Sequence, residues 1–389
     1  MDFELDQETR NSLEALKVWG SDVVRPVGLE ADRQARPIPV GDPYFDRCLE
    51  RGDGRTHWRP EGSAKSDKRT STLSRLLLSE EFAYWDRAVM IANPGPGLPE
   101  LSVIGGGTEE QKERFLLPFV NPDRPRWACF AMTEPGAGSD AAAIATKAQK
   151  DGDGWILNGA KCFIGSASRS DWILVQATVD ITKGRAAQRA FFVEQGAEGL
   201  GPFKIEKKMG LKAYESSSFT LENVRVPGSN LLGGEERYEK KAGFKTAMST
   251  FNAGRPVIAA NAVGIARAAL DETIRFAKEA DLLGDGRVRD RIETISRKVR
   301  MARLVCLRAG QLADEQRPNI VEASMSKALA AQVAQEATSH GLELIGIAGG
   351  RGDHLIEKLY RDAKAMDIVE GTGQIQRMII ARSLVGLPR

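Results

Sequence analysis

Apolar residues recur at helical spacing at both ends of the chain, while short apolar runs occupy its middle. In the first part, residues 72–85 place apolar side chains three and four positions apart, which predicts a helix. Residues 35–66 are rich in Pro, Gly and charge, so we expect an irregular segment there. Residues 1–126 are therefore predicted to form an N-terminal helical domain.

The next part, residues 127–240, has the pattern of a small β-domain. Gly, Asp and Asn turns separate its short alternating or apolar runs, which lie at 155–158, 171–177, 189–193 and 217–226.

Long Ala-rich segments return after Gly243, including 259–280 and 323–344. Their helix propensity and their 3.6-residue apolar period predict that residues 241–389 form a closing helical bundle. The fold class is therefore α+β, in the order helical, β, helical. Because the linkers are short, we expect the three parts to pack as one body with a ligand site at their junction.

Composition and charge exclude several function classes. The chain has 55 basic and 53 acidic residues mixed along its length, so no cationic field for nucleic acid is expected. No apolar run approaches the ~18 residues that a membrane helix needs. The acidic start is followed by no secretory signal, which makes the cytoplasm the expected location. The basic residues Lys65, Lys68, Arg69 and Arg75 are better explained by a solvated loop and helix start than by an anion site.

The four cysteines and three histidines have no metal-ligand spacing. Cys48, Cys129, Cys162 and Cys306 are far apart and form no Cys-x-x-Cys pair. We therefore expect reduced, structural thiols and no metal site.

A Gly-rich loop is the first candidate for ligand chemistry. Residues 128–140 predict a strand followed by a loop, in which small residues let backbone N–H groups approach a planar or anionic ligand. Thr133 and Ser139 add hydroxyl groups. Taken alone, such a loop is usually only a turn.

The sequence of this loop, Thr-Glu-Pro-Gly-Ala-Gly-Ser-Asp at 133–140, closely resembles the flavin-binding signature of acyl-CoA dehydrogenases. The resemblance covers roughly residues 100–389, and the first hundred residues fit only loosely. The other matching motifs follow in the family's order at 158–166, 243–245, 254–260, 262–266, 357–364 and 368–377. The resemblance implies an N-terminal helical domain, a middle β-barrel-like domain and a C-terminal four-helix bundle, with FAD between the last two.

The resemblance also implies which residues contact FAD. These are Phe130, Met132, Thr133, Gly138, Ser139, Phe163, Gly165, Ser166, Thr372 and Gln374. The family usually has Trp-Ile-Thr where this chain has Phe-Ile-Gly at 163–165. The aromatic residue is thus kept in smaller form, but the threonine hydroxyl expected near flavin N5 is missing. Ser166 is the candidate substitute.

Glu370 corresponds to the family's catalytic base in a Glu-Gly-Thr motif. In the family this carboxylate removes the α-proton of an acyl thioester while a hydride leaves the β-carbon for flavin N5. The base's backbone N–H and a ribityl hydroxyl of FAD hold the thioester oxygen. Burial beside an acyl chain should raise the pKa of Glu370 toward neutrality. An isolated Glu-Gly-Thr would better fit a surface or helix-capping glutamate, but the surrounding motifs favour the base.

Some family members place the base directly before the arginine that corresponds to Arg255. This chain has Gly254 there, so no second base competes. The resemblance assigns the substrate contacts to Ser139, Arg255, Glu370 and Gly371.

One part of the family pattern is missing. In homomeric members, a neighbouring subunit grips the adenine and pyrophosphate half of FAD through an Arg-x-x-Phe-Gly motif, a following Gln and a Gln-x-x-Gly-Gly loop. Counting along this chain places Ala280, Leu283, Arg291, Glu343 and Gly346-Ile347 at those positions. Losing an arginine contact to phosphate removes roughly 1.5–3 kcal/mol. Either a related subunit supplies the grip, as in α2β2 members, or other residues bind the FAD tail.

The expected function is FAD-dependent α,β-dehydrogenation of an acyl thioester, most simply acyl-CoA, with an electron-transfer flavoprotein as acceptor. The assembly is expected to be a homo-oligomer or a heterotetramer with a related subunit. Two alternatives stay open, namely a flavin oxidase or monooxygenase on the same fold and a noncatalytic acyl-thioester-binding subunit.

Overall fold

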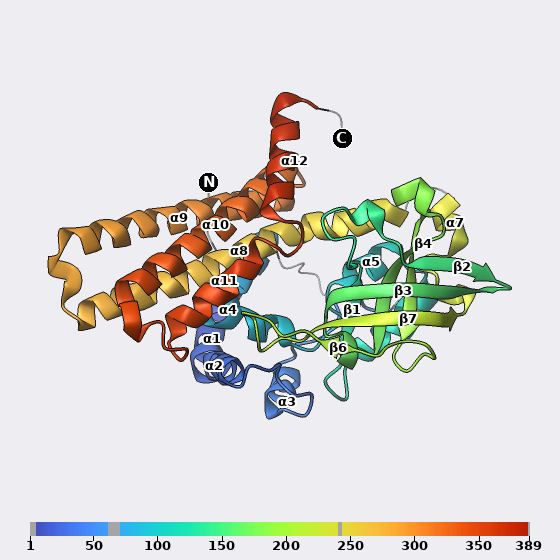
Figure 1. Cartoon of the computed structure of the whole chain (residues 1–389), viewed down its shortest axis with the longest axis horizontal. Coiled ribbons are helices and arrows are strands. Elements are labelled where there is room, and N and C mark those ends of the chain that lie inside the picture. The colour runs from blue at the N-terminus through green and yellow to red at the C-terminus, as the bar shows by residue number, and fades with distance from the viewer. Residues whose placement is uncertain (1–4, 61–70, 240–242, 388–389) are drawn as a thin grey trace.

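The computed structural model describes residues 5–60, 71–239 and 243–387, with side chains described outside 239–253. Helices lie at both ends of the chain and a sheet lies between them, as the sequence predicts (Figure 1). The predicted basic residues Lys65, Lys68 and Arg69 lie outside the described residues, and Arg75 belongs to a helix.

The N-terminal helices include the predicted one, which spans Thr72–Ala92 and begins at a Ser71 cap. The elements of this part are α1 (Gln7–Trp19), η1 (Gly20–Val24), α2 (Arg25–Arg33), α3 (Pro43–Glu50), α4 (Thr72–Ala92), α5 (Pro99–Gly106), α6 (Glu109–Leu116) and η2 (Leu117–Phe119).

The expectation of an irregular segment at 35–66 was wrong for α3. Asp42 caps this helix by accepting a hydrogen bond from the Tyr44 N–H, and Pro43 occupies its first position. Tyr44, Phe45 and Cys48 are buried along one face. A local cap and a short apolar face thus form a helix in a segment whose composition favours loops.

The middle strands form one seven-stranded sheet in the order β1-β4-β2-β3-β7-β6, with β5 paired to β4. All four predicted runs are strands, and the first extends much further than expected. The strands are β1 (Ala128–Ala131), β2 (Lys147–Asp151), β3 (Gly154–Gly165), β4 (Trp172–Thr178), β5 (Gln188–Glu194), β6 (Lys204–Ile205) and β7 (Ser216–Val226). Strands β1 and β2 both run parallel to β4, whereas β3 is antiparallel to β2 and β7.

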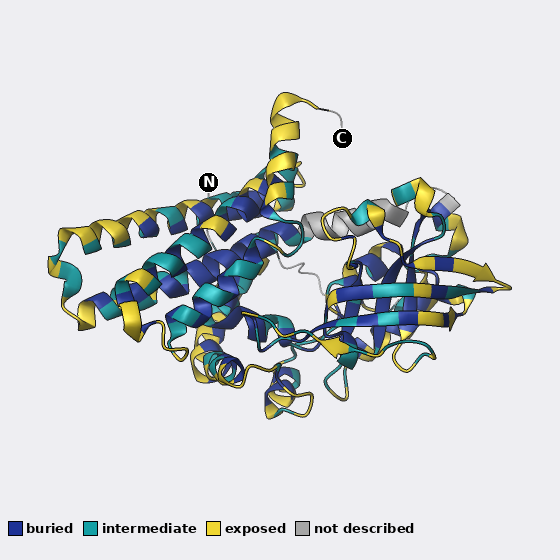
Figure 2. Ribbon diagram, viewed as in Figure 1, coloured by how far each residue is buried: buried dark blue, intermediate teal, exposed yellow. Residues whose placement is uncertain are grey.

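Long helices build the C-terminal part, and the two Ala-rich segments lie in α8 and α10 as predicted. The elements are α7 (Gly234–Glu239), α8 (Gly243–Glu279), η7 (Leu282–Gly284), α9 (Gly286–Asp314), α10 (Ile320–Ile345), η8 (Gly346–Ala348), α11 (Leu355–Met366) and α12 (Gly373–Val385). Figure 2 shows their buried sides turned toward one another and toward α4. None of the helices in the described ranges is long and apolar enough to cross a membrane.

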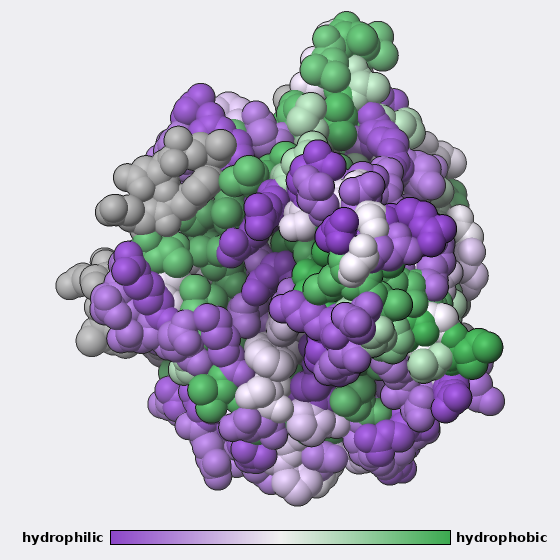
Figure 3. All heavy atoms as spheres, turned by 90° about the vertical axis from the view of Figure 1, so that its left-hand side faces the viewer, coloured by the Kyte–Doolittle hydropathy of each residue, from purple (hydrophilic) through white to green (hydrophobic). Residues whose placement is uncertain are grey.

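Helix α12 projects from the body and carries exposed apolar side chains. Leu384 and Val385 are 71% and 68% exposed, and Met378 is 48% exposed. Figure 3 shows apolar residues gathered on this projection.

All four cysteines are free and buried, which confirms the expectation of reduced structural thiols.

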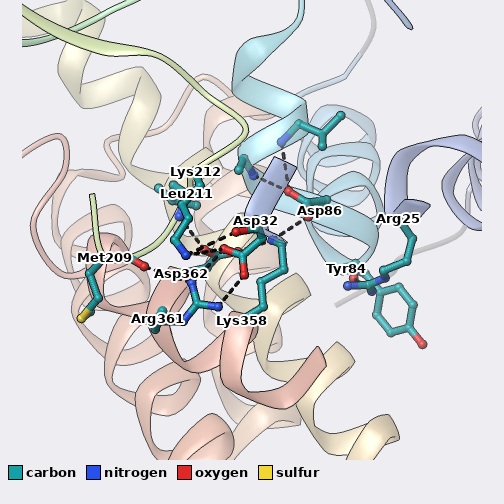
Figure 4. A network of polar contacts seen from close by, with 12 residues as sticks. Arg25, Asp32, Tyr84, Asp86, Met209, Leu211, Lys212, Lys358, Arg361 and Asp362 are labelled. Carbon is teal, nitrogen blue, oxygen red and sulfur yellow. Dashed lines mark hydrogen bonds and ion pairs between the residues drawn. The ribbon is translucent and has the colours of Figure 1, made fainter. Parts of the chain in front are cut away.

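A buried ion cluster joins the N-terminal helices to the C-terminal part (Figure 4). Lys358 Nζ lies 2.6 Å from Asp86 Oδ2 and 2.5 Å from Asp362 Oδ2, and these three side chains are 0–3% exposed. Asp362 also accepts the Leu211 N–H from the β6–β7 loop at 2.5 Å. Burial alone would lower the pKa of Lys358, but the two carboxylates raise it, so the lysine stays charged.

Replacing Lys358 by methionine should leave two carboxylates buried without their cation. We expect Lys358→Met to lower the free energy of unfolding by about 3–5 kcal/mol in a urea titration. Lys17→Met, which breaks the exposed Lys17–Glu14 pair, is the control and should cost less than about 1 kcal/mol. Equal losses in the two variants would show that the cluster is not a structural lock.

Candidate functional site

Glu370 lies in a tight turn between α11 and α12. Its φ is +53° and that of Gly371 is +92°, so two consecutive residues are in the left-handed region. Glycine adopts such a φ at little cost, whereas glutamate does so only when its surroundings hold it there. Glu370 Oε2 is buried, and no hydrogen-bond partner for it lies among the described residues.

Two side chains hold this turn by the carbonyl of Gly371. Lys327 Nζ, from α10, donates to Gly371 O at 2.7 Å. Gln376 Nε2, from α12, donates to the same oxygen at 3.0 Å. Both residues are fully buried, so their hydrogen bonds fix the turn that carries Glu370.

Three cations act electrostatically on the Glu370 carboxyl group. Burial raises the pKa of Glu370, and the charges of Arg87, Lys327 and Arg255 oppose that rise, with Arg87 acting most strongly. Burial also lowers the pKa of Lys327 to about 8. The net effect is a carboxyl group with a raised pKa in a positively charged, largely dry site.

Arg87 reaches this site because α4 is interrupted one residue earlier. Asp86 has φ −165° and ψ 115°, which are extended values inside a helix. Its Oδ1 accepts the N–H groups of Ala88 and Val89 at 2.8 and 3.0 Å, so it caps the second half of α4. The Lys358 cluster holds the other oxygen of Asp86 and thereby fixes where Arg87 begins.

The Gly-rich loop at 133–140 is held by hydrogen bonds from β3, and space remains beside its glycines. Lys161 Nζ donates to Glu134 Oε1 at 2.7 Å and to Met132 O at 3.0 Å, and both side chains are buried. A Cβ added at Gly136 or Gly138 would meet no atom within 4 Å. The backbone of this loop is therefore free to approach a ligand.

The end of β3 lies beside this loop, because the Cys162 N–H donates to Thr133 O at 3.0 Å. Phe163 has φ +57° and a side chain that is 67% exposed. An apolar ring held outward in this way fits contact with a planar ligand.

Tyr214 fills the space beside Gly165. A Cβ on Gly165 would lie 2.8 Å from Tyr214 Cε2 and 3.0 Å from the tyrosine hydroxyl. The ring therefore occupies the space that a threonine side chain at position 165 would need. The chain thus lacks the threonine hydroxyl of the motif, but the Tyr214 hydroxyl, from the loop before β7, lies close to the same position.

Comparisons with known proteins agree with this arrangement. The family profiles described as "Acyl-CoA dehydrogenase, middle domain" and "Acyl-CoA dehydrogenase, C-terminal domain" match residues 129–224 and 241–385. The chain is 33% identical to the probable acyl-CoA dehydrogenase FadE25 of Mycobacterium tuberculosis, over 98% of this chain and 97% of the relative. This chain belongs to the acyl-CoA dehydrogenase family.

Two further proteins resemble this acyl-CoA dehydrogenase family member, one in sequence and one also in three-dimensional structure. The 3-(aryl)acrylate reductase of Clostridium sporogenes is 40% identical over 74% of this chain and 75% of the relative. The butyryl-CoA dehydrogenase of Megasphaera elsdenii superposes with a TM-score of 0.88 at 30% identity, covering 99% of this chain and 100% of that one. The acyl-CoA dehydrogenase fold predicted from the motifs is thereby confirmed, with N-terminal helices, a middle β half-barrel and a C-terminal helical domain.

The residues that the resemblance assigned to flavin and substrate fall into two groups around the junction. Phe130 lies in β1. The loop that follows β1 carries Met132, Thr133, Gly138 and Ser139, and the end of β3 carries Phe163, Gly165 and Ser166. Arg255, Glu370 and Gly371 lie in the C-terminal part. Thr372 Oγ1 accepts the Ile375 N–H and caps α12, and Gln374 is exposed. Residues 243–245 begin α8, but their side chains are not described.

Gly254 leaves room for the side chain of Glu370, the residue that corresponds to the family's base. A Cβ on Gly254 would lie 2.0 Å from Glu370 Oε2. The side chain of residue 370 therefore occupies the place where a side chain of residue 254 would begin. Glu370 can take this position only because residue 254 is glycine.

The positions that grip the FAD tail in homomeric members hold different contacts here. Arg291 Nη1 pairs with Glu343 Oε2 at 3.0 Å, so two of the altered positions bind each other. Ile347 is 84% exposed. Leu283 lines a hollow of about 370 Å³, whose other lining residues include Arg289, Arg297 and Arg300.

Sequence reasoning missed Arg87, Lys327, Gln376 and Tyr214. Gln376 lies inside the recognised motif at 368–377 but had no role assigned there, and the other three lie outside the recognised motifs. Each of the four residues comes from a different element. The Ala-rich composition of α10 made Lys327 look like an ordinary helix residue.

The fit of Tyr214 against Gly165 can be tested by a double-mutant cycle. Gly165→Thr should lower thermal stability because its Cβ collides with the ring, whereas the same change in a Tyr214→Ala background should cost much less. The expected coupling energy is about 0.5–3 kcal/mol. Gly105→Thr is the control, since a Cβ there meets nothing within 4 Å. Equal penalties in the two backgrounds would refute the pairing.

Proposed function

We propose that this chain is an FAD-dependent acyl-thioester dehydrogenase in which Glu370 removes the α-proton of the substrate. The observation that carries this proposal is the buried Glu370 Oε2, which has no hydrogen-bond partner in the described part of the chain. A carboxylate kept free of hydrogen bonds at the junction of the three parts is available to accept a proton from a ligand.

The surroundings of Glu370 suit a base. The α-proton of a thioester is very weakly acidic, so the base must stay ionised until substrate binds and must then hold the proton firmly. Arg87, Lys327 and Arg255 favour the ionised form, while burial raises the pKa of Glu370. Substrate binding excludes water and strengthens the second effect.

The backbone of the Glu370 turn is suited to a second role. In this proposal the Glu370 N–H donates to the thioester carbonyl oxygen, where negative charge develops as the α-proton leaves. Lys327 and Gln376 hold the turn through the Gly371 carbonyl and so keep this N–H in a fixed orientation. Arg255, which is 8% exposed, acts electrostatically on the same carboxylate, and in this proposal it faces the substrate.

The residues at the ends of β1 and β3 fit the ring of a flavin. The open backbone at Gly136 and Gly138, the hydroxyls of Thr133 and Ser139 and the exposed Phe163 ring offer hydrogen bonds and a flat apolar contact. When bound, FAD supplies the acceptor for the hydride from the β-carbon. Tyr214 and Ser166 are the hydroxyls that remain near the position of the absent threonine.

The same chemistry can run in the opposite direction. The relative that is 40% identical is named as a reductase of 3-(aryl)acrylate, whose double bond is the type that dehydrogenation forms. We therefore include reduction of an α,β-unsaturated acyl thioester as a second candidate function. A free base at Glu370 favours both directions over an oxidase, a monooxygenase or a noncatalytic subunit.

We further propose that a related subunit holds the adenine half of FAD in a heteromeric assembly, with an electron-transfer flavoprotein as acceptor. The Arg291–Glu343 pair makes two of the usual tail positions unavailable to a diphosphate. The projecting apolar α12 supports assembly with another chain. The hollow beside Leu283, with its three arginines, is the alternative holder in a homomer.

Glu370→Gln tests the proposed base. The variant should bind flavin and thioester normally, but anaerobic flavin reduction by an acyl-CoA should slow by about 10²–10⁴-fold because only the proton acceptor is lost. In the wild type, the reduction rate should rise with pH through the raised pKa of Glu370, because the ionised carboxylate is the active form. Arg87, Lys327 and Arg255 set this pKa, and Glu370→Gln should lose this rising limb. Reduction at more than a tenth of the wild-type rate would reject the assignment.

Flavin content tests the assembly. Expressed alone, the chain should hold FAD substoichiometrically. Co-expression with a related chain that carries the Arg-x-x-Phe-Gly and Gln-x-x-Gly-Gly motifs should raise flavin content and melting temperature together, since a cofactor that binds only the folded assembly stabilises it. A homo-oligomer with one FAD per subunit, lost on Arg297→Ala and Arg300→Ala, would instead favour the hollow beside Leu283.

A further inference from the structure

The turn that carries Glu370 is held through one backbone oxygen. The carbonyl of Gly371 accepts hydrogen bonds from Lys327 Nζ at 2.7 Å and from Gln376 Nε2 at 3.0 Å. Among the described residues, the backbone groups of Glu370 and Gly371 make no other hydrogen bond. Because both residues have φ values in the left-handed region, these two contacts must offset the conformational cost of a left-handed glutamate.

Lys327 makes the stronger of the two contacts. An ammonium group donates a charge-assisted hydrogen bond, which is roughly twice as strong as that of a neutral amide. The other end of the Gln376 amide is not held, since its buried Oε1 has no partner among the residues that the structure describes. Lys327 also reaches the turn from a different helix, α10, whereas Gln376 lies only five residues after Gly371. The ammonium therefore ties the turn to the helical bundle.

The surroundings of Lys327 give its ammonium weak support. Burial lowers the pKa of Lys327 to about 8. Asp367 at the end of α11 and Glu370 in the turn favour the charged form, but they do not cancel the effect of burial. Arg255 in α8 and Arg377 in α12 add to that effect. Lys327 therefore loses its proton as the pH rises through about 8.

We propose that Lys327 is a positioning residue whose ammonium form holds the Glu370 turn and whose neutral form releases it. This inference rests on the proposed function, because the turn carries both the base and the N–H that faces the thioester oxygen. A neutral amine donates a weaker hydrogen bond than an ammonium does. Once Lys327 is neutral, Gln376 is the main hold on the Gly371 carbonyl, and the left-handed backbone at Glu370 can relax.

Loss of the Lys327 proton has two opposite effects on the base. Glu370 loses one of the three cations that favour its ionised form, so its pKa rises and the carboxylate becomes a stronger base. The relaxed turn, however, moves the carboxylate away from the α-carbon. Misplacement of a reacting group by about 1 Å costs about 100-fold in rate. We therefore expect the loss of position to outweigh the gain in basicity, so that activity falls.

The pH dependence of anaerobic flavin reduction by butyryl-CoA tests this role. In the wild-type holoenzyme, the rate at saturating thioester should rise as Glu370 ionises and fall again above about pH 8, while thioester affinity changes little. Lys327→Met should reduce flavin about 10- to 100-fold more slowly at neutral pH and should lose the falling limb. Lys327→Arg, whose guanidinium stays charged, should recover part of the rate and also lack the fall.

Lys298→Met is the matched control for these variants. Lys298 pairs with Glu336 of α10 at 2.7 Å, and its charge is not among those that act on Glu370 or Lys327. Its loss should leave the pH profile unchanged.

Two other lysines could produce a limb at the same pH. Burial also lowers the pKa values of Lys161 and Lys208 to about 8, so the limb belongs to Lys327 only if the Lys327 variants lose it. A wild-type rate that does not fall at alkaline pH, or a fall that the Lys327 variants keep, would overturn the inference.

Hydrogen exchange tests the turn independently of the dehydrogenation. The Gly373 N–H donates to Asp367 O at 2.9 Å and closes the turn. In the wild-type holoenzyme, residues 367–376 should lose protection above about pH 8, after correction for the intrinsic pH dependence of exchange. Lys327→Met should lack this protection already at neutral pH. Unchanged wild-type protection would overturn the inference whatever the activity. Loss of protection in a protein that reduces no flavin at any pH would support the role of Lys327 in the turn and reject the proposed dehydrogenation.

Discussion

The interaction on which the site depends is the buried contact of Lys358 with Asp86 and Asp362. One lysine links α4 to α11, and Asp362 carries the link on to the β6–β7 loop. Arg87 lies in α4, Glu370 follows α11 and Tyr214 lies in the β6–β7 loop. The relative positions of the three parts of the chain are therefore fixed by ionic contacts as well as by apolar packing. Apolar packing is tolerant of small shifts, whereas a buried ion cluster loses most of its stabilisation when one partner moves.

Much of the architecture could be predicted from the sequence because periodicity reports burial directly. The strands at 171–177 and 217–226 and the helix in α10 follow from alternating or 3.6-residue patterns. The Glu370 turn was located through its motif. Composition misled at α3, where Pro and charged residues suggested a loop, because a single Asp42 cap outweighs average composition over so short a helix.

The side chains that converge on Glu370 could not be predicted in the same way. Arg87 points into the site because the backbone of Asp86 leaves the helical region, and no local pattern announces that interruption. Lys327 looks like a solvated residue of an Ala-rich helix, yet it donates to a carbonyl 44 residues later in the chain. Tyr214 acquires its place only in relation to Gly165, so its role is a property of the pair.

The contact between Gly254 and Glu370 has a consequence for how such enzymes change over time. Any side chain at 254 meets the carboxylate of residue 370, and a second carboxylate there would add charge repulsion to the steric conflict. A transfer of the carboxylate from one position to the other therefore needs both residues to change, or needs Glu370 to leave its present rotamer in a form that has both. Positions 254 and 370 are thus coupled, because a substitution at either one alters which side chain fits at the other.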